Sequence, residues 1–133
     1  METKRTRFSF LIPIIVMTTF VFSNSVSAQD KNLIVRIAKL QIDTAQLENY
    51  KAAVKEHIET AVRVEPGVLT LYAVYEKNNP THVTVFEIYA NIEAYRAHLE
   101  TTHFKKYKTG TKDMVKSLEL IETVPIALAA KPK

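Results

Sequence analysis

Residues 65–108 decide the fold of this chain. They read EPGVLTLYAVYEKNNPT (65–81), HVTVFEIYA (82–90) and NIEAYRAHLETTHFKKYK (91–108). The proline–glycine pair at 66–67 is typical of a helix end, where glycine can adopt the left-handed conformation of a cap. Two runs rich in β-branched and aromatic residues flank the turn signal at 78–80, which predicts a β-hairpin. A helix that carries His98 and His103 is expected to follow.

Outside this stretch, the spacing of apolar residues predicts the remaining elements. These are strands at 32–42 and 117–124, an amphipathic helix at 45–65 and a helical segment at 103–115. Asp43 and Gln46 resemble a capping box at the start of the first helix. Thr101 and Thr102 predict a break in the second helix. The order β-α-β-β-α-β is the split βαβ, ferredoxin-like pattern of an α+β fold.

The two hairpin strands are apolar on both faces. In the first strand Leu69, Leu71, Ala73 and Tyr75 alternate with Val68, Thr70, Tyr72 and Val74, and in the second Val83, Val85, Glu87 and Tyr89 alternate with His82, Thr84, Phe86 and Ile88. A sheet with one face in water alternates cleanly between apolar and polar residues, so both faces are expected to be covered. Helices can cover one face, but the chain is too short to supply a layer for the other. We therefore expect a homodimer, with a cavity between the sheet and its cover.

The N-terminal segment has the three-part layout of a secretory signal peptide. Three basic residues precede an apolar run from Phe8 to Phe22, and the polar stretch SNSVSAQD follows. Cleavage after Ala28 would remove residues 1–28 and leave residues 29–133 as one domain of ordinary size. The alternative is a membrane anchor, but the run is shorter than a span of ~20 residues and contains Pro13. We expect a periplasmic or secreted protein with no stable membrane anchor after cleavage.

The composition excludes several classes of function. The chain has no cysteine, which excludes disulfides, thiolate metal sites and lipid attachment at a cysteine. Its formal charge of +4 comes partly from residues 1–28, which hold three basic residues and one acidic residue. The remainder is weakly basic and has no cluster typical of nucleic-acid binding.

Three motifs follow one another along the chain. They are RVEPGVLTLYAV (63–74), NNPTHVTVFEIYA (78–90) and EAYRAHLETTHF (93–104). In this order and spacing they resemble the antibiotic biosynthesis monooxygenase (ABM) superfamily, and its quinol-monooxygenase-like branch in particular. The resemblance covers nearly all of residues 29–133. It implies a dimeric α/β-barrel in which two sheets face each other, with a ligand cavity in each subunit. It also implies that dioxygen oxidises a small aromatic or quinol substrate without metal, flavin or haem.

Such a reaction needs a base for the substrate hydroxyl, and the sequence offers His103 or His98. A histidine titrates near neutral pH, which suits proton abstraction from a phenol. On a continuous helix the two side chains would point about 140° apart, so they share a site only if the helix breaks between them. Alternatively, His103 braces the break. His57, in the first helix, is expected either to be exposed to solvent or to brace the neighbouring structure. The five-residue spacing is not the i, i+4 pair of a helical zinc site, so no metal is expected.

Glu87 and four aromatic residues complete the candidate site. A buried carboxylate has a raised pKa and can act as an acid or a base. Glu87 could instead pair with Arg36 or Lys39 on a neighbouring strand. The aromatic residues either line the substrate pocket or belong to the core, and they are Tyr72, Phe86, Tyr89 and Tyr95.

Other functions on the same fold stay open. One branch of the superfamily degrades haem with an Asn, Trp, His triad, where this chain has Ala38, His98 and Lys108, which argues against haem degradation. An exported module that binds a small hydrophobic molecule without catalysis is one alternative to the monooxygenase. An isomerase is the other, because one fold supports many activities.

Overall fold

The computed structural model describes residues 32–132, so the predicted signal peptide lies outside the described residues. The elements are β1 (Ile34–Ile42), the short 3-10 helix η2 (Thr44–Gln46), α1 (Leu47–Val64), β2 (Val68–Glu76), β3 (Asn79–Tyr89), α2 (Ile92–Glu100), α3 (Thr102–Thr111) and β4 (Val115–Thr123). This order confirms the predicted ferredoxin-like α+β fold. Asp43 caps η2 by accepting a hydrogen bond from the N–H of Ala45 at 2.8 Å. The Gln46 side chain bonds to Asn49, so the reciprocal half of the predicted capping box is wrong.

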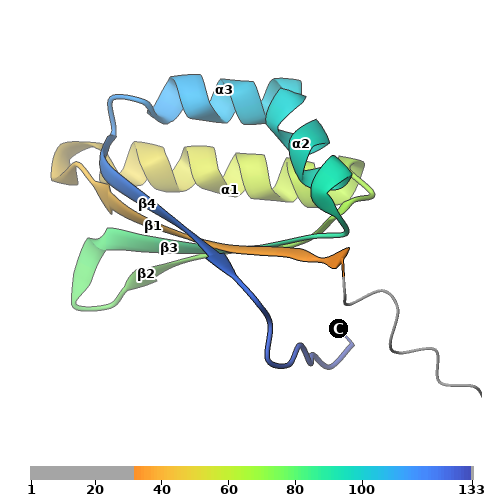
Figure 1. Cartoon of the computed structure of the whole chain (residues 1–133). Coiled ribbons are helices and arrows are strands. Elements are labelled where there is room, and N and C mark those ends of the chain that lie inside the picture. Colours follow the sequence, from red (N-terminus) through yellow and green to blue (C-terminus); the bar gives the residue numbers. More distant parts are fainter. Residues whose placement is uncertain (1–31, 133) are drawn as a thin grey trace, which may run out of the picture.

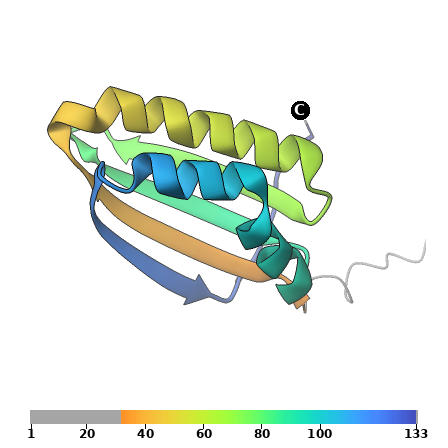
Figure 2. The ribbon, with the colours of Figure 1, turned by 90° about the horizontal axis from the view of Figure 1, so that it is seen from above.

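The four strands form one antiparallel sheet in the order β2-β3-β1-β4. The three α-helices lie on one face of this sheet (Figure 1). Seen from above, α1 and α3 lie side by side across the sheet, and β4 lies outside them at one edge (Figure 2). Within the described residues, the sheet therefore has one face covered by helices and one face without them.

The core fills the space between the helices and the covered face. Tyr50, Val54, His57 and Ala61 are buried along α1, and their spacing places them on one stripe of the helix. This stripe packs against buried residues of the sheet, which are Ala38, Leu40, Ile42, Val68, Leu71, Val83, Val85 and Tyr89. Because His57 belongs to the stripe, the expectation that it is solvated is wrong, and it packs as a core residue.

β2 departs from regular alternation near its start. Its pairing with β3 shifts register between Val68 and Thr70, so β2 carries one extra residue, as in a β-bulge. Val68 and Leu71 are both buried on the helix side, whereas Leu69 is half-exposed. The predicted placement of Val68 and Leu71 on opposite faces of the strand is wrong, because the extra residue interrupts strict alternation. The hairpin turn lies at residues 77–78, slightly earlier than predicted.

A single residue separates α2 from α3, which confirms the predicted break. Thr101 is extended, with φ −68° and ψ 150°. Its hydroxyl donates to the carbonyl of His98 at 2.8 Å and accepts from the N–H of Phe104 at 3.2 Å. Thr101 therefore ends one helix and caps the start of the next, and the two helices run in different directions (Figure 1).

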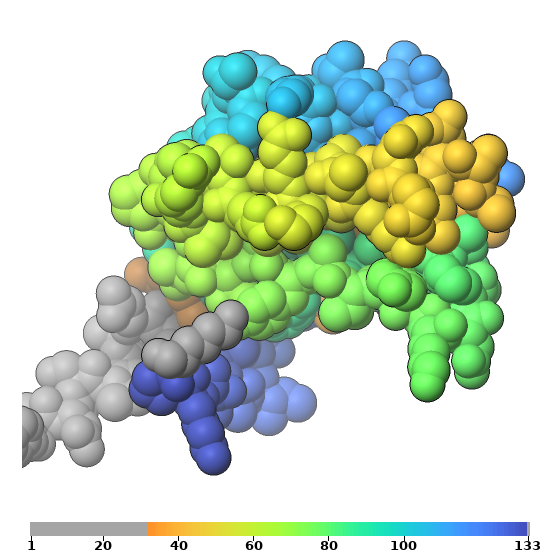
Figure 3. Space-filling view, turned by 180° about the vertical axis from the view of Figure 1, so that it is seen from behind, coloured from red at the N-terminus to blue at the C-terminus, as the bar shows by residue number. Residues whose placement is uncertain are grey.

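The face away from the helices carries exposed apolar side chains. Tyr72 and Val74 in β2 are 59% and 62% exposed. The hairpin tip and the residues that follow β4 project from this side of the molecule (Figure 3). The predicted homodimer would cover this face, and it stays a prediction. None of the helices within residues 32–132 is long and apolar enough to cross a membrane.

Gly67 is required for space and not for a left-handed backbone. No glycine in the described part of the chain has a positive φ, so the predicted left-handed cap is wrong. A Cβ at this position would lie 2.4 Å from the Cβ of Ala94 in α2. Only glycine therefore lets the start of β2 pass so close to α2. The carbonyl of Gly67 also accepts a hydrogen bond from the N–H of Ala90 at 2.9 Å.

Gly67→Ala is expected to lower the free energy of unfolding by about 1–3 kcal/mol, because the overpacked contact must be relieved by moving backbone. Gly110→Ala in α3 is the matched control, since its Cβ would meet no atom of the described residues within 4 Å. This control should raise stability by about 0.4–1 kcal/mol through the unfolded chain's lower entropy. Urea unfolding of both variants measures the difference, and equal stabilities would contradict this account of Gly67.

Candidate active site

A cavity of about 110 Å³ lies between the covered face of the sheet and the helices. Most of its wall is apolar and consists of Ala38, Leu40, Val54, Ile58, Leu71, Val85, Leu99, Phe104, Leu118 and Leu120. Its polar lining residues are His57, Glu87, Tyr89, Tyr95, His98, Tyr107 and Lys108. An apolar cavity with a few convergent polar groups is the usual form of a small-molecule site.

The cavity brings together four of the residues predicted for the site, which are Glu87, Tyr89, Tyr95 and His98. Tyr72 and Phe86 lie on the other face of the sheet. Side chains alternate along a strand, and the neighbouring Leu71 and Val85 face the helices. His103 does not line this cavity. It borders a second cavity of about 130 Å³, which His57 also borders.

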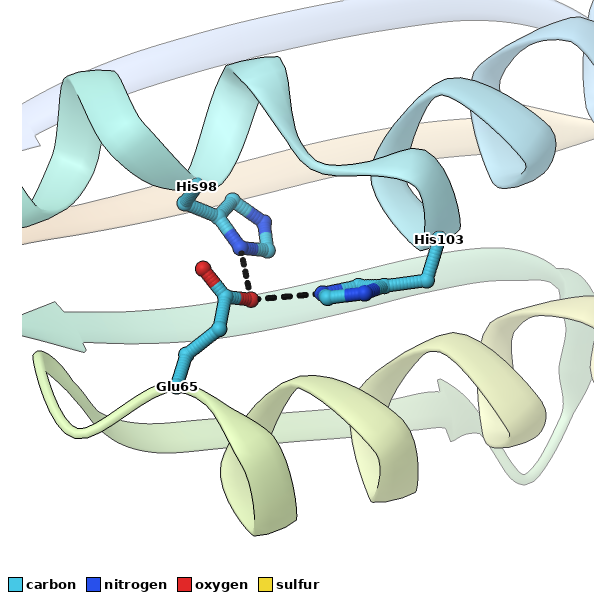
Figure 4. A group of neighbouring side chains, drawn as sticks. All are labelled: Glu65, His98 and His103. Carbon is cyan, nitrogen blue, oxygen red and sulfur yellow. Dashed lines mark hydrogen bonds and ion pairs between the residues drawn. The ribbon is translucent and has the colours of Figure 1, made fainter.

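Both histidines of α2 and α3 contact one carboxylate. His98 Nδ1 donates to Glu65 Oε2 at 2.8 Å, and His103 Nε2 donates to the same oxygen at 2.6 Å (Figure 4). The side chains of Glu65, His98 and His103 are 13%, 2% and 19% exposed. We call these three residues the Glu–His–His cluster. Because Glu65 engages Nδ1 of His98, Nε2 is the ring nitrogen that remains for a ligand in the cavity.

Local backbone structure explains how the cluster forms. Glu65 ends α1 directly before Pro66 and is extended, with φ −106° and ψ 107°, as expected for a residue before proline. The break at Thr101 places His98 in the last turn of α2 and His103 in the first turn of α3. On a continuous helix these side chains would diverge by about 140°. Across the break they approach the same carboxylate oxygen.

His57 is a third histidine beside the cluster. Its ring centroid lies 5.2 Å from that of His98 and 5.8 Å from that of His103, and its ring stacks on Tyr107 at 4.6 Å. The pKa of His57 is lowered to about 4, first by burial and then by the positive charge that the other two histidines can carry. His57 is therefore neutral near pH 7. Its buried Nδ1 has no hydrogen-bond partner among the described residues.

A second polar group of the cavity centres on Glu87. The Tyr89 hydroxyl donates to Glu87 Oε2 at 3.2 Å. Burial raises the pKa of Glu87 above its usual range, against the opposing effects of this hydrogen bond and of the Arg36 charge. Arg36 lies opposite Glu87 in the sheet. Its guanidinium nevertheless contacts Tyr95, donating to the hydroxyl and lying 4.7 Å from the ring centroid.

Glu65 is not among the residues predicted for the site, although it belongs to the EPG motif. One signal could have identified it: a carboxylate at the C-terminal end of a helix, where the helix dipole disfavours negative charge. When such a residue is buried, it needs hydrogen-bond donors or a positive partner. The atoms of Glu65, His98 and His103 that can bind a metal, one carboxylate oxygen and two ring nitrogens, all lie within 4.8 Å of one another. The cluster could therefore also hold a metal ion.

Residues 33–110 match the sequence profile of the family described as antibiotic biosynthesis monooxygenase. Among curated proteins, none matches the chain at a significant level. A crystal structure of a candidate antibiotic biosynthesis monooxygenase from Bacteroides thetaiotaomicron is 53% identical to this chain. The match covers 78% of this chain and 99% of that one, with a TM-score of 0.74.

Two further solved structures share the fold. A candidate monooxygenase from Lactobacillus acidophilus is 36% identical with a TM-score of 0.69, and the match covers 74% of this chain but 46% of that one. A candidate antibiotic biosynthesis monooxygenase from Nitrosomonas europaea is 22% identical with a TM-score of 0.67, covering 71% of this chain and 91% of that one. At that identity the likeness shows the fold alone. By the profile match and the 53% identical relative, the chain belongs to the antibiotic biosynthesis monooxygenase family.

Proposed function

We propose that this protein is a monooxygenase that oxidises a small aromatic hydroxyl compound, such as a quinol, with dioxygen and without a bound cofactor. The observation that carries the proposal is the position of His98. Its buried imidazole borders an apolar cavity and is anchored by Glu65 through Nδ1. Membership of the family supports the class of reaction. The choice of a quinol rests on the motif resemblance and on the size and lining of the cavity.

The cavity suits a substrate of about one ring. Its volume of about 110 Å³ is comparable to the roughly 150 Å³ of a cavity that admits benzene in another protein. Leu40, Val85 and Phe104 contribute apolar walls, which keep water away from the reacting ring. Tyr95 and Lys108 also line the cavity and supply polar groups that can stabilise a phenolate oxygen.

His98 acts as the base in this proposal. Its Nε2 takes the proton of the substrate hydroxyl, and Glu65 holds the ring in the correct tautomer and stabilises the imidazolium that forms. The electron-rich phenolate then reacts with dioxygen. For a simple quinol, one oxygen atom enters the ring and the other leaves in water. Quinol and dioxygen therefore give a hydroxyquinone and water, and no other reductant is needed.

We also propose that two copies of the chain pair through the sheet face without helices. Tyr72 and Val74 are exposed on that face of the single chain. An apolar sheet face in water favours association, and a second copy offers an identical face. This pairing would form the dimeric α/β-barrel that the resemblance implies.

Purified protein mixed with reduced quinols is expected to consume dioxygen faster than quinol autoxidation, with no added cofactor. His98→Ala should lower the rate by about 10²–10⁴-fold, which is the usual contribution of a positioned base. His82→Ala is the matched control, because this half-exposed side chain lies near the hairpin turn and outside the cavity lining. An oxygen electrode measures the rate of oxygen uptake by the wild type and by both variants.

Several results would overturn parts of this proposal. Loss of oxygen uptake in His103→Ala, with His98→Ala unaffected, would make His103 the base. Saturable binding of the quinols by calorimetry without oxygen uptake would favour the non-catalytic binding module. Conversion of a substrate without oxygen consumption would favour the isomerase.

Light scattering of the protein at micromolar concentration is expected to give twice the mass of one chain. Val74→Lys places a charge in the proposed interface and should shift the protein toward the monomer, because burying an unpaired charge is costly. Val62→Lys is the matched control, since Val62 is exposed on α1 on the helix side of the molecule, and it should leave the mass unchanged. A wild-type protein with the mass of one chain would overturn the proposed dimer.

A further inference from the structure

We propose that the Glu–His–His cluster binds a divalent transition-metal ion such as Zn²⁺, with Glu65, His98 and His103 as ligands. The binding site itself is independent of the proposed function. The effect of metal binding on catalysis rests on that function, because an ion held at Nδ1 of His98 competes with the use of this residue as a base. The structure assigns the site through three observations: the ligand atoms, the backbone that holds them, and the buried His57 beside them, whose Nδ1 has no hydrogen-bond partner among the described residues.

The donor atoms have the separation that a compact site needs. The two nitrogens lie 2.8 and 2.6 Å from Glu65 Oε2, and all three donors lie within 4.8 Å of one another. Around a tetrahedral Zn²⁺, with bonds of about 2.0–2.2 Å, ligand atoms lie about 3.3 Å apart. Side-chain movements of less than about 1 Å would open the cluster to that spacing, and the ion would replace the protons that now join His98 and His103 to Glu65.

The three ligands are held by the backbone and largely shielded from water. Glu65 is fixed at the end of α1 by Pro66, and the Thr101 hydroxyl contacts both the end of α2 and the start of α3. His98 is almost fully buried, whereas His103 retains some exposure and borders the second cavity. This second cavity provides an entry route for an ion on the side of His103.

The chemistry of the ligands selects the class of ion. Two imidazoles and one carboxylate suit Zn²⁺, Co²⁺ or Fe²⁺, whereas Mg²⁺ and Ca²⁺ prefer oxygen ligands. A separate observation also points to a ligand: His57 is buried beside the cluster, and its Nδ1 has no hydrogen-bond partner among the described residues. Its ring lies at 5.2 and 5.8 Å from the other two imidazoles. It therefore offers a further nitrogen next to the bound ion.

Metal binding and base catalysis exclude each other at His98. An imidazole whose Nδ1 binds a metal keeps its proton on Nε2, which then donates to the cavity and cannot accept a substrate proton. The cluster would then exist in two forms: a proton-linked form with His98 as a base and a metal-bound form without one. Zn²⁺ is therefore expected to inhibit oxygen uptake.

Titration of untagged, chelator-treated protein with Co²⁺ and Zn²⁺ tests the site directly. Co²⁺ should produce the visible absorption of a four- or five-coordinate ion, and calorimetry should show one Zn²⁺ per chain. Glu65→Gln keeps the size of the side chain but removes its charge, and it should weaken binding by at least about tenfold. His82→Ala is the matched control and should bind like the wild type. Thermal unfolding of metal-free samples shows that each variant is folded.

The outcomes separate the site from the proposed function. Absence of Zn²⁺ and Co²⁺ binding at micromolar concentration, or equal binding by Glu65→Gln and wild type, would overturn the site whatever the oxygen uptake. Binding that leaves quinol oxidation unchanged would overturn the competition at His98. Oxygen uptake that rises with a bound ion would overturn both that competition and the cofactor-free reaction, while supporting the site.

Discussion

Glu65 accepts hydrogen bonds from two histidines of different helices, and the arrangement of α1, α2 and α3 depends on this pair of contacts. A buried carboxylate costs free energy unless donors surround it. Glu65 also lies at the end of α1, where the helix dipole opposes its charge. His98 and His103 offset both costs. Without them, an uncompensated charge would lie beneath α2 and α3, and His98 would lose its anchor at the cavity wall.

Two local irregularities make this interaction possible. The extended backbone at Thr101 redirects the chain, so that His103 returns toward Glu65 instead of following the surface of a continuous helix. Gly67 lets the start of β2 pass against Ala94, which brings α2 close to the end of α1. A longer uninterrupted helix would be more regular. It would also separate the two histidines and remove the contacts that hold His98 in place.

Two buried carboxylates lie in different environments: Glu87 lines the cavity, and Glu65 lies behind His98 in its wall. Glu65 accepts hydrogen bonds from two imidazoles, and its contact with Nδ1 orients the His98 ring. Glu87 receives one hydrogen bond from Tyr89, and burial raises its pKa. Divergent surroundings of this kind assign different roles to chemically similar groups. In the proposed reaction Glu65 would orient the base, and in the proposed metal site it would bind the ion, whereas Glu87, with its raised pKa, would more readily retain a proton beside the substrate.

The sequence by itself determined the order of elements and the break at Thr101, because periodicity, turn signals and caps are local properties. It also named His98, Glu87, Tyr89 and Tyr95 as candidate site residues, and all four line the cavity, whereas His103, Tyr72 and Phe86 do not. The bulge after Val68 depends on pairing with β3, so strict alternation assigned the wrong faces near the start of β2. The role of Gly67 depends on its close approach to Ala94 in α2, so the cap rule predicted a left-handed backbone that is not there. Only the tertiary structure decided the cluster. Glu65 and His103 are 38 residues apart in the chain, and they meet because three helix ends pack at one point over the sheet.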